Sequence, residues 1–354
     1  MKFGVLYDMR NPAQPDWHIP WPQFYGEAFD HMEAVDRLGF ESIGFCEHHG
    51  DPDGYNPSII GSMTAASLRT KRARIGSNII VLPQHHPVRL AEDLAVVDIV
   101  SGGRLDLGVG PGGPFDMEYR MLGINPKHKP SRLEEATEII LRAWTEDEPF
   151  TYRGKRFEFE DVWINPKPLQ KPPPVFMTAP LADAAMDRVI RLGVGVGALG
   201  SSFFGPADRD SWIDWVGRWT ARCEDNGVHP REYRSSSFAT CFVTEDPEKA
   251  WAEHRKAHLH LLSYERQGVR PYAGFLGLDN LTEPEQLPGW EYVFVTPEQA
   301  IEAFRHAYHD GAPDEVQLMA RRASMSWEQS LEHLRLFKEK VEPALRDLPR
   351  IGEA

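Results

Sequence analysis

Residues 74–110 read RIGSNIIVLPQHHPVRLAEDLAVVDIVSGGRLDLGVG, and this stretch decides the fold. The β-branched run over 73–83 predicts a strand, apolar residues recur at helical spacing over 86–101, and 103–110 predicts a second strand. Pro87 suits the first turn of the helix between them. A strand, a helix and a second strand in this order form a right-handed crossover. The stretch therefore predicts neighbouring parallel strands.

The same alternation continues on both sides of this stretch. Further strands are expected at 2–7, 41–46, 174–179, 193–199, 235–243 and 314–320, and further helices at 23–40, 56–70, 130–147, 182–192, 208–226, 246–267, 297–310 and 326–345. About eight strands, each followed by a helix, predict a (β/α)8 TIM barrel with its site at the C-terminal ends of the strands. A doubly wound sheet is the alternative, since a strand count from one sequence can err by one or two. We expect one domain over 1–354 with two insertions, a β-hairpin near 150–165 and an irregular segment near 268–296.

The composition limits the class of function. The 354 residues include 39 Lys and Arg against 53 Asp and Glu, and a net charge of −14 disfavours binding to nucleic acid. The longest apolar runs, such as NIIVLP at 78–83, are too short to cross a bilayer. The N-terminus does not resemble a signal peptide, and the three cysteines are too widely spaced for a disulfide framework. We therefore expect a cytoplasmic protein with reduced cysteines.

Four side chains of metal-binding type adjoin at Cys46–His49, where the second predicted strand ends. Adjacent strand residues point to opposite faces, so His48 and His49 do not easily share one ion, and a metal site is not favoured. A place at the C-terminal edge of a barrel favours acid–base chemistry by an imidazole, with a buried structural histidine as the alternative. A second group of histidines lies on a predicted helix among charged neighbours, and we interpret it as a solvated face: His254, His258 and His260.

Two other motifs could hold a phosphate. The turn GVGPGG at 108–113 satisfies a dinucleotide-binding pattern, but Pro114 and a loop follow it, and Glu134 lies in a helix instead of at a strand end. Its glycines would let a ligand approach closely, or they form a tight turn. Ser131 and Arg132 begin the next helix and could clamp a phosphate. The residues alone favour the alternative, an N-capping serine beside a solvated arginine.

Several of these segments together resemble the bacterial-luciferase-like flavin-dependent monooxygenases. The segments are LGFESIGFCEHH (38–49), residues 74–112, SRLEEA (131–136), residues 150–179 and TPEQAIEAFRHAYHDGAPDEVQLM (296–319). The resemblance covers nearly the whole chain and weakens over 200–290. It implies a (β/α)8 barrel with insertions, usually dimeric, that binds reduced FMN at the C-terminal ends of the strands.

The resemblance also implies roles for individual residues. His48 would be the catalytic acid–base group beside the flavin, and Glu47 would lie under the ring. Asn78 and Ile79 would carry a non-proline cis peptide bond against the ring. The other implied cofactor contacts are Gly110 at the flavin, Arg132 at the phosphate, the backbone of Ala179 and Pro180 at the phosphate, and Ser201 in the loop after the sixth strand.

Two positions depart from luciferase itself. Luciferase has an arginine where this chain has Pro111 and a Glu-Ser pair where it has Pro180-Leu181, so the phosphate contacts must differ. Luciferase also works as a pair of different subunits, and nothing in this sequence points to light emission.

The implied reaction is the oxygenation of a small, partly apolar organic substrate. A separate reductase would supply reduced FMN, which adds O₂ to form a C4a-(hydro)peroxyflavin that His48 stabilises. Water must be excluded, and the irregular insertion could provide an apolar cover with Tyr272, Phe275, Leu276 and Trp290. Other aromatic residues could line the substrate pocket: Phe115, Tyr119, Phe203 and Phe204.

The expected partners are the flavin reductase and a second copy of the chain in a homodimer. Two alternative functions stay open. One is a coenzyme F420-dependent oxidoreductase of the same superfamily, and the other is a non-catalytic flavin-binding protein.

Overall fold

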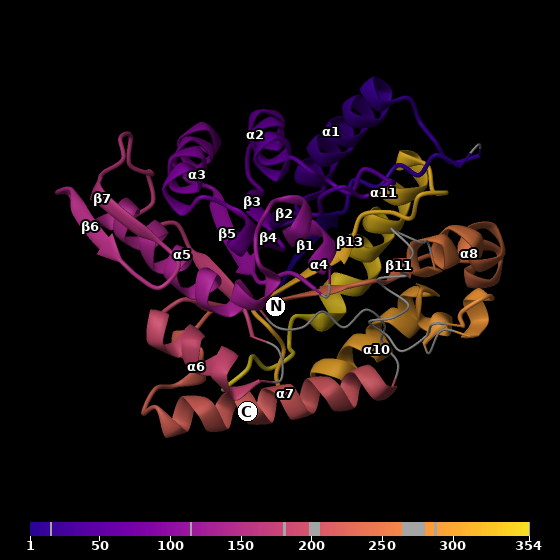
Figure 1. Ribbon diagram of the computed structural model, residues 1–354. Helices are drawn as coiled ribbons and strands as arrows, with labels where there is room; N and C mark the ends of the chain where they lie inside the picture. The colour runs from indigo at the N-terminus through magenta and orange to yellow at the C-terminus, as the bar shows by residue number, and fades with distance from the viewer. Residues whose placement is uncertain are drawn as a thin grey trace.

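Eight parallel strands close into a barrel that helices surround (Figure 1). The computed structural model describes residues 1–14, 16–113, 115–179, 182–197, 206–263, 280–286 and 289–353, with the backbone alone for 206–209, 262 and 263. The barrel strands are β1 (Lys2–Tyr7), β2 (Ser42–Phe45), β3 (Arg74–Ser77), β5 (Leu105–Gly110), β8 (Val175–Thr178), β9 (Gly195–Gly197), β10 (Ser235–Ala239) and β13 (Glu315–Met319). They pair in the order β3-β2-β1-β13-β10-β9-β8-β5, and β3 also pairs with β5. This last pairing closes the sheet, so the predicted barrel is confirmed and the open doubly wound sheet is excluded.

The helices lie outside the barrel, as the alternation in the sequence predicts (Figure 1). They are α1 (Trp21–Leu38), α2 (Ile59–Arg69), α3 (Pro87–Ser101), α4 (Asp116–Met121), α5 (Lys129–Thr145), α6 (Asp183–Leu192), α7 (Pro206–Asp225), α8 (Pro247–Ser263), α10 (Pro297–Tyr308) and α11 (Trp327–Leu336). Local signals set their ends: α3 begins at Pro87 and ends at Gly102, whose φ of +74° is left-handed. In the described part of the chain, no helix combines the length and apolar character that a membrane span requires.

Both predicted insertions are present, one of them described only in part. The hairpin consists of β6 (Phe150–Arg153) and β7 (Glu158–Val162), which pair antiparallel. In the segment near 268–296, the described residues form two 3-10 turns and a short strand, β12 (Phe294–Val295). β12 pairs with β11 (Phe242–Val243), which follows β10 and precedes α8.

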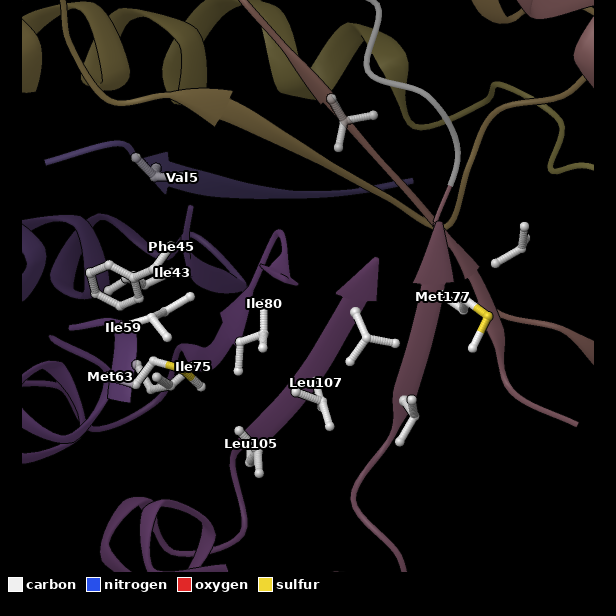
Figure 2. Close-up of a cluster of buried hydrophobic side chains, with 14 of the residues drawn as sticks. Val5, Ile43, Phe45, Ile59, Met63, Ile75, Ile80, Leu105, Leu107 and Met177 are labelled. Carbon is white, nitrogen blue, oxygen red and sulfur yellow. The ribbon is translucent and has the colours of Figure 1, made fainter. Parts of the chain in front are cut away.

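The main hydrophobic core lies between the strands and the helices. Figure 2 shows Ile59 and Met63 of α2 close to Ile43 and Phe45 of β2 and Ile75 of β3. All five side chains are at most 1% exposed, and burial of each contributes about 1.5–3 kcal/mol before entropy is counted. Because successive strand residues point to opposite faces, the residues between these positions point toward the barrel axis.

The barrel axis is lined by polar side chains and glycines. Gln317 of β13 donates from Nε2 to Ser42 Oγ (3.0 Å), and its Oε1 accepts from Asn78 Nδ2 (3.2 Å). A Cβ at Gly44 would collide with the Gln317 amide, so a larger residue there would displace that amide from its hydrogen bonds. TIM barrels are mostly filled by branched aliphatic side chains. Here a hydrogen-bonded set replaces part of that filling and orients Asn78 at the end of β3.

Two histidines are buried beside this barrel wall. His31 accepts or donates hydrogen bonds with the Tyr7 hydroxyl (2.8 Å) and the Ser330 hydroxyl (3.0 Å). Burial, reinforced by the positive charge of Arg321, lowers the pKa of His31 to about 3. Burial also lowers the pKa of His333 to about 3. Both rings are therefore neutral in the folded protein at pH values where the unfolded chain protonates them.

The free energy of unfolding should fall as the pH is lowered from 6.5 to 4.5. The unfolded histidines bind protons below their ordinary pKa of 6.5, whereas the folded ones do so only near pH 3. Each buried ring therefore lowers the free energy of unfolding by up to about 1.4 kcal/mol for each pH unit below 6.5. Urea unfolding at a series of pH values measures this slope. The His31→Gln variant should reduce it by up to about 1.4 kcal/mol per pH unit.

The exposed His306 provides the matched control for this measurement. His306→Gln removes a histidine without removing a buried ring, so the part of the slope that comes from burial should stay as in the unmodified protein. If His31→Gln and the unmodified protein have the same slope, then buried His31 is not a source of the pH dependence.

Candidate functional site

The polar residues at the end of β2 lie on the C-terminal edge of the barrel. β1, β2 and β13 are neighbours in register, with Tyr7 opposite Phe45 and Leu6 opposite Met319. The segments that follow these strands therefore meet at one edge. This confirms the position predicted for Cys46–His49, because the C-terminal ends of parallel barrel strands form one face.

His48 is held by a buried carboxylate from α4. Its Nδ1 lies 3.0 Å from Glu118 Oε1, and Glu118 is 2% exposed. The Tyr55 ring lies 4.2 Å from the imidazole between centroids, and the Phe115 ring meets it edge-on at 4.8 Å. A carboxylate at Nδ1 assigns the proton of the neutral ring to Nδ1 and leaves Nε2 as the basic nitrogen. The pair is thus built to move a proton at Nε2.

Glu47 is buried and bound to three groups. One oxygen accepts from the Val81 backbone N–H (2.7 Å), and both oxygens lie within 3.1 Å of His85 Nε2. His49 Nε2 lies 3.3 Å from the same carboxylate. Burial opposes ionisation of Glu47, but His85 and His49 together lower its pKa to about 2. Glu47 is therefore a carboxylate at neutral pH, and it ties the end of β2 to β4 (Ile80–Val81).

The neighbouring histidines divide between two carboxylates, since His48 contacts Glu118 and His49 contacts Glu47. The two side chains thus face different groups, as expected for adjacent residues of an extended chain. The structure brings a different set together, because donor atoms of Glu47, His49 and His85 lie within 4.8 Å of one another. Such a set could hold a metal ion, although the hydrogen bonds from Val81 and His85 already account for the buried carboxylate.

The peptide bond between Asn78 and Ile79 is cis, as the resemblance implied. The Asn78 N–H donates to the Phe45 carbonyl (2.7 Å), so this bond lies directly beside the end of β2. Gly110 ends the neighbouring β5, and a Cβ on it would lie 2.8 Å from Ile79 Cδ1. Gly110 therefore allows the backbone and Ile79 to pack closely. The structure brings together Asn78, Ile79, Gly110 and the strand that leads to His48.

Arg132 lies at the same end of the barrel. Its Nε donates to the Pro83 carbonyl (2.8 Å), and its guanidinium covers the Phe157 ring at 4.5 Å. No described residue accepts a hydrogen bond from its two terminal nitrogens, so they can serve an anionic ligand. Ser131 is not the N-cap, which is His128; its hydroxyl donates to the His128 carbonyl instead.

The other expected phosphate contacts have less support. The Ala179 N–H donates to the Gly197 carbonyl (3.0 Å), and its own carbonyl accepts from Trp215 Nε1 (2.8 Å). Because the Ala179 N–H is already hydrogen-bonded to the neighbouring strand, the structure does not favour the expected phosphate contact at this backbone. Pro180, Leu181 and Ser201 lie outside the described residues.

The histidines of α8 are not a solvated face, so that interpretation is wrong. His254 and His258 are 5% and 0% exposed. His254 Nδ1 contacts Ser324 Oγ (2.9 Å), and His260 Nε2 contacts Asp53 Oδ2 (2.9 Å). Charged neighbours along the sequence did not reveal this, because α8 packs on the β11–β12 pair and on the segment after β13.

The predicted aromatic cover is only partly described. Tyr272, Phe275, Leu276, Phe203 and Phe204 lie outside the described residues. Among the described candidates, Phe115 contacts His48, while Tyr119 donates to the Pro111 carbonyl (2.7 Å). Trp290 stacks on Trp251 at 5.1 Å and packs against a second hydrophobic core that includes Phe242 of β11 and Phe294 of β12.

Sequence reasoning missed several residues of the site. Glu118 lies in a segment interpreted as a loop, yet an acidic residue shortly after a Gly-rich strand end was a usable signal. His85 stands in the quoted stretch 74–110 without a role, and its neighbour Pro87 marks it as a residue of the β3–α3 connection. Gln317 gave a weaker signal, a polar residue inside an apolar strand.

Solved structures with the same fold include monooxygenases and coenzyme F420 enzymes. A monooxygenase from Streptomyces bottropensis is 24% identical with a TM-score of 0.80, covering 97% of this chain and 99% of that one. The oxygenating constituent of a Pseudomonas putida diketocamphane monooxygenase, in complex with FMN, is 19% identical with a TM-score of 0.74 (99% and 100%). An F420-dependent secondary alcohol dehydrogenase is 17% identical with a TM-score of 0.73 (98% and 99%). These likenesses show the shared fold.

Curated relatives are similar over parts of their lengths. Limonene 1,2-monooxygenase of Rhodococcus erythropolis is 29% identical over 279 residues, 77% of this chain and 69% of the relative. The oxygenase component of a flavin-dependent trigonelline monooxygenase of Acinetobacter baylyi is 31% identical over 181 residues, 51% and 49%. An uncharacterized protein of Sinorhizobium fredii is 36% identical over 151 residues, so the match spans 42% of this chain and 43% of that relative. The model of the family described as luciferase-like monooxygenase matches residues 1–315, and the chain belongs to that family.

Proposed function

We propose that the protein is the oxygenase of a two-component monooxygenase, which uses reduced FMN from a separate reductase and O₂ to oxygenate a small organic substrate. The His48–Glu118 pair carries this proposal, because it places an acid–base group after β2, whose last residue, Phe45, is hydrogen-bonded to Asn78 of the cis peptide. Similarity to the oxygenase component of a flavin-dependent monooxygenase supports it. A solved structure of the same fold is described in complex with FMN.

The residues present fit an FMN group. Gly110 lets the end of β5 pack closely against Ile79, so the cis peptide that would border the ring is held in place. The terminal nitrogens of Arg132 suit the FMN phosphate. When bound, reduced FMN supplies the electrons and the reaction with O₂. We propose that Glu47 lies under the ring, where its charge is compensated by His85 and His49.

The chain's own residues would then position the ligands and transfer a proton. Glu118 holds the His48 ring through Nδ1, so that Nε2 gives or takes the proton on the side of the ligand. Positive charge on the ring is stabilised by the same carboxylate, as in other His–carboxylate pairs. Phe115 and Tyr55 cover two sides of the ring and limit the access of water.

Coenzyme F420 is the alternative cofactor, since an F420 enzyme shares the fold with a TM-score of 0.73. The two proposals differ in what an anaerobic titration measures. We expect reduced FMN to quench or shift the protein fluorescence with a Kd in the micromolar range typical of enzyme ligands, and F420 to bind more weakly. The Arg132→Gln variant should weaken FMN but not riboflavin, which lacks the phosphate. Tight F420 binding without FMN affinity would overturn the FMN proposal.

His48→Ala should lower oxygenation at least tenfold while the protein still binds FMN, in line with general acid–base contributions. Glu118→Gln should also lower it, since the amide cannot stabilise the imidazolium. The measurement is mass spectrometry of products formed under ¹⁸O₂ with a reductase and a substrate panel.

His306→Ala serves as the matched control for these variants, because its side chain is exposed and far along the chain from the site. Unchanged turnover in His48→Ala would remove His48 from the mechanism. Release of H₂O₂ without any ¹⁸O-labelled product, across the panel, would favour a non-catalytic flavin-binding protein instead.

We also propose that the protein is a homodimer, joined through α2 and α3. These adjacent helices expose three large apolar side chains, Leu68 (64%), Val96 (45%) and Val100 (37%). Sedimentation equilibrium should give twice the chain mass of 40.2 kDa. The double substitution Leu68→Glu and Val96→Glu should give the monomer mass, whereas Leu169→Glu, at a residue 57% exposed elsewhere, should not. A monomer mass for the unmodified chain would contradict the dimer. The cytoplasmic location stays a prediction.

A further inference from the structure

Three arginines are buried at the C-terminal edge of the barrel, next to the candidate site. Arg10 follows β1, and Arg321 and Arg322 follow β13; they are 5%, 5% and 4% exposed. β1 lies between β13 and β2, so the three guanidiniums emerge beside the strand that leads to His48. The mechanism described above does not use any of them.

Arg321 and Arg322 lack a carboxylate partner in the described part of the chain, since none lies within 4.0 Å of either. Arg10 has Asp8 at 4.0 Å. Burial lowers the pKa of each of these two arginines to about 10, so both remain cations at neutral pH. Buried cations are normally paired, because removing a charge from water costs several kcal/mol or more.

The hydrogen bonds of Arg322 leave its far end available. Its Nε donates to His258 Nδ1 (3.1 Å), and the Phe242 ring lies 5.4 Å from its guanidinium carbon. Its two terminal nitrogens donate to no residue in the described ranges. Arg321 resembles it: Nη2 donates to the Ala323 carbonyl (2.6 Å), while Nη1 is buried without a partner among the described residues. A planar guanidinium held at Nε presents its terminal N–H groups to a bidentate anion.

An aromatic bridge joins this group to the acid–base pair. The Arg10 guanidinium lies 3.9 Å from the centre of the Tyr55 ring. The same ring lies 4.2 Å from the His48 ring. Arg322 interacts electrostatically with Arg10, Asp8 and Tyr55, so these groups share one neighbourhood. Arg10, Tyr55 and His48 are therefore successive neighbours, and this chain of contacts links the arginines to the acid–base pair.

We propose that Arg322, with Arg10, binds an anionic group of the substrate, such as a carboxylate, sulfonate or phosphate ester, and so directs the rest of the substrate toward His48. The claim that the anion belongs to the substrate rests on the proposed oxygenase function. The anion site itself is argued from the arginines alone. It also gives α8 a role, because His258 orients Arg322 by accepting from Nε. The FMN phosphate is assigned elsewhere, to Arg132 on α5.

Isothermal titration calorimetry of the full chain, without flavin, tests the site with four probes of one shape: benzoate, benzenesulfonate, phenyl phosphate and benzamide. We expect at least one anion to bind tenfold more tightly than neutral benzamide. Arg322→Gln should weaken that anion at least tenfold and leave benzamide unchanged. Arg322→Lys should retain part of the affinity, because it keeps the charge without the planar fork. Arg335→Gln is the matched control, since Arg335 is 44% exposed on α11.

The inference is overturned if no anion binds more tightly than benzamide, or if Arg322→Gln and Arg335→Gln both bind the anions like the unmodified protein. Should Arg322→Gln fail to fold, which its far-ultraviolet circular dichroism would show, the unmodified protein and Arg322→Lys still decide the matter. FMN titration separates this site from the proposed function. Arg322→Gln should bind FMN normally, and failure of the unmodified protein to bind FMN would reject the proposed function while the anion result stands.

Discussion

Closure of the barrel by the β3–β5 pairing is the constraint on which the rest of the structure depends. In an open sheet β3 and β5 would lie at opposite edges, so Glu118, which follows β5, would be far from His48, which follows β2. Closure places β5 beside β3, so Gly110 packs against Ile79 and Glu118 contacts His48. The segments after β3, β2, β1 and β13 follow consecutive strands and are neighbours in either sheet. Without closure His48 would lose its carboxylate partner.

Burial of charge is the second constraint, and it divides the opening into two sides. On one side, Glu47 and Glu118 are buried carboxylates that histidines neutralise or contact. On the other, Arg321 and Arg322 are buried cations without carboxylate partners in the described residues. An uncompensated buried charge is costly. The carboxylates on the first side already have partners within the protein, whereas the two arginines on the second side have no carboxylate partner among the described residues. This difference is the reason that we assign the flavin and the substrate anion to separate groups.

Periodicity in the sequence predicted the fold well. The β-branched and amphipathic runs predicted most strands and helices to within a few residues, because burial of one face demands a regular spacing of apolar residues. Two predicted strands are divided in the structure: 73–83 into β3 and β4, and 235–243 into β10 and β11, which belong to different sheets. Proline and glycine also marked real ends, as at Pro87 and Gly102. The solvated interpretation of the α8 histidines failed for a related reason. Spacing along α8 does not say which element packs against it, and β11 and β12 cover the face that carries His254 and His258.

The sequence by itself determined the strand–helix alternation, the place of Glu47 and His48 at a strand end, and the family resemblance that several segments carry together. Only the tertiary structure decided the partners of those side chains. Glu118 reaches His48 from 70 residues away, and Arg322 reaches His258 from 64 residues away. Such contacts depend on barrel closure and on the packing of distant helices. No local pattern encodes them, because local patterns record burial and backbone preference, not which charges meet.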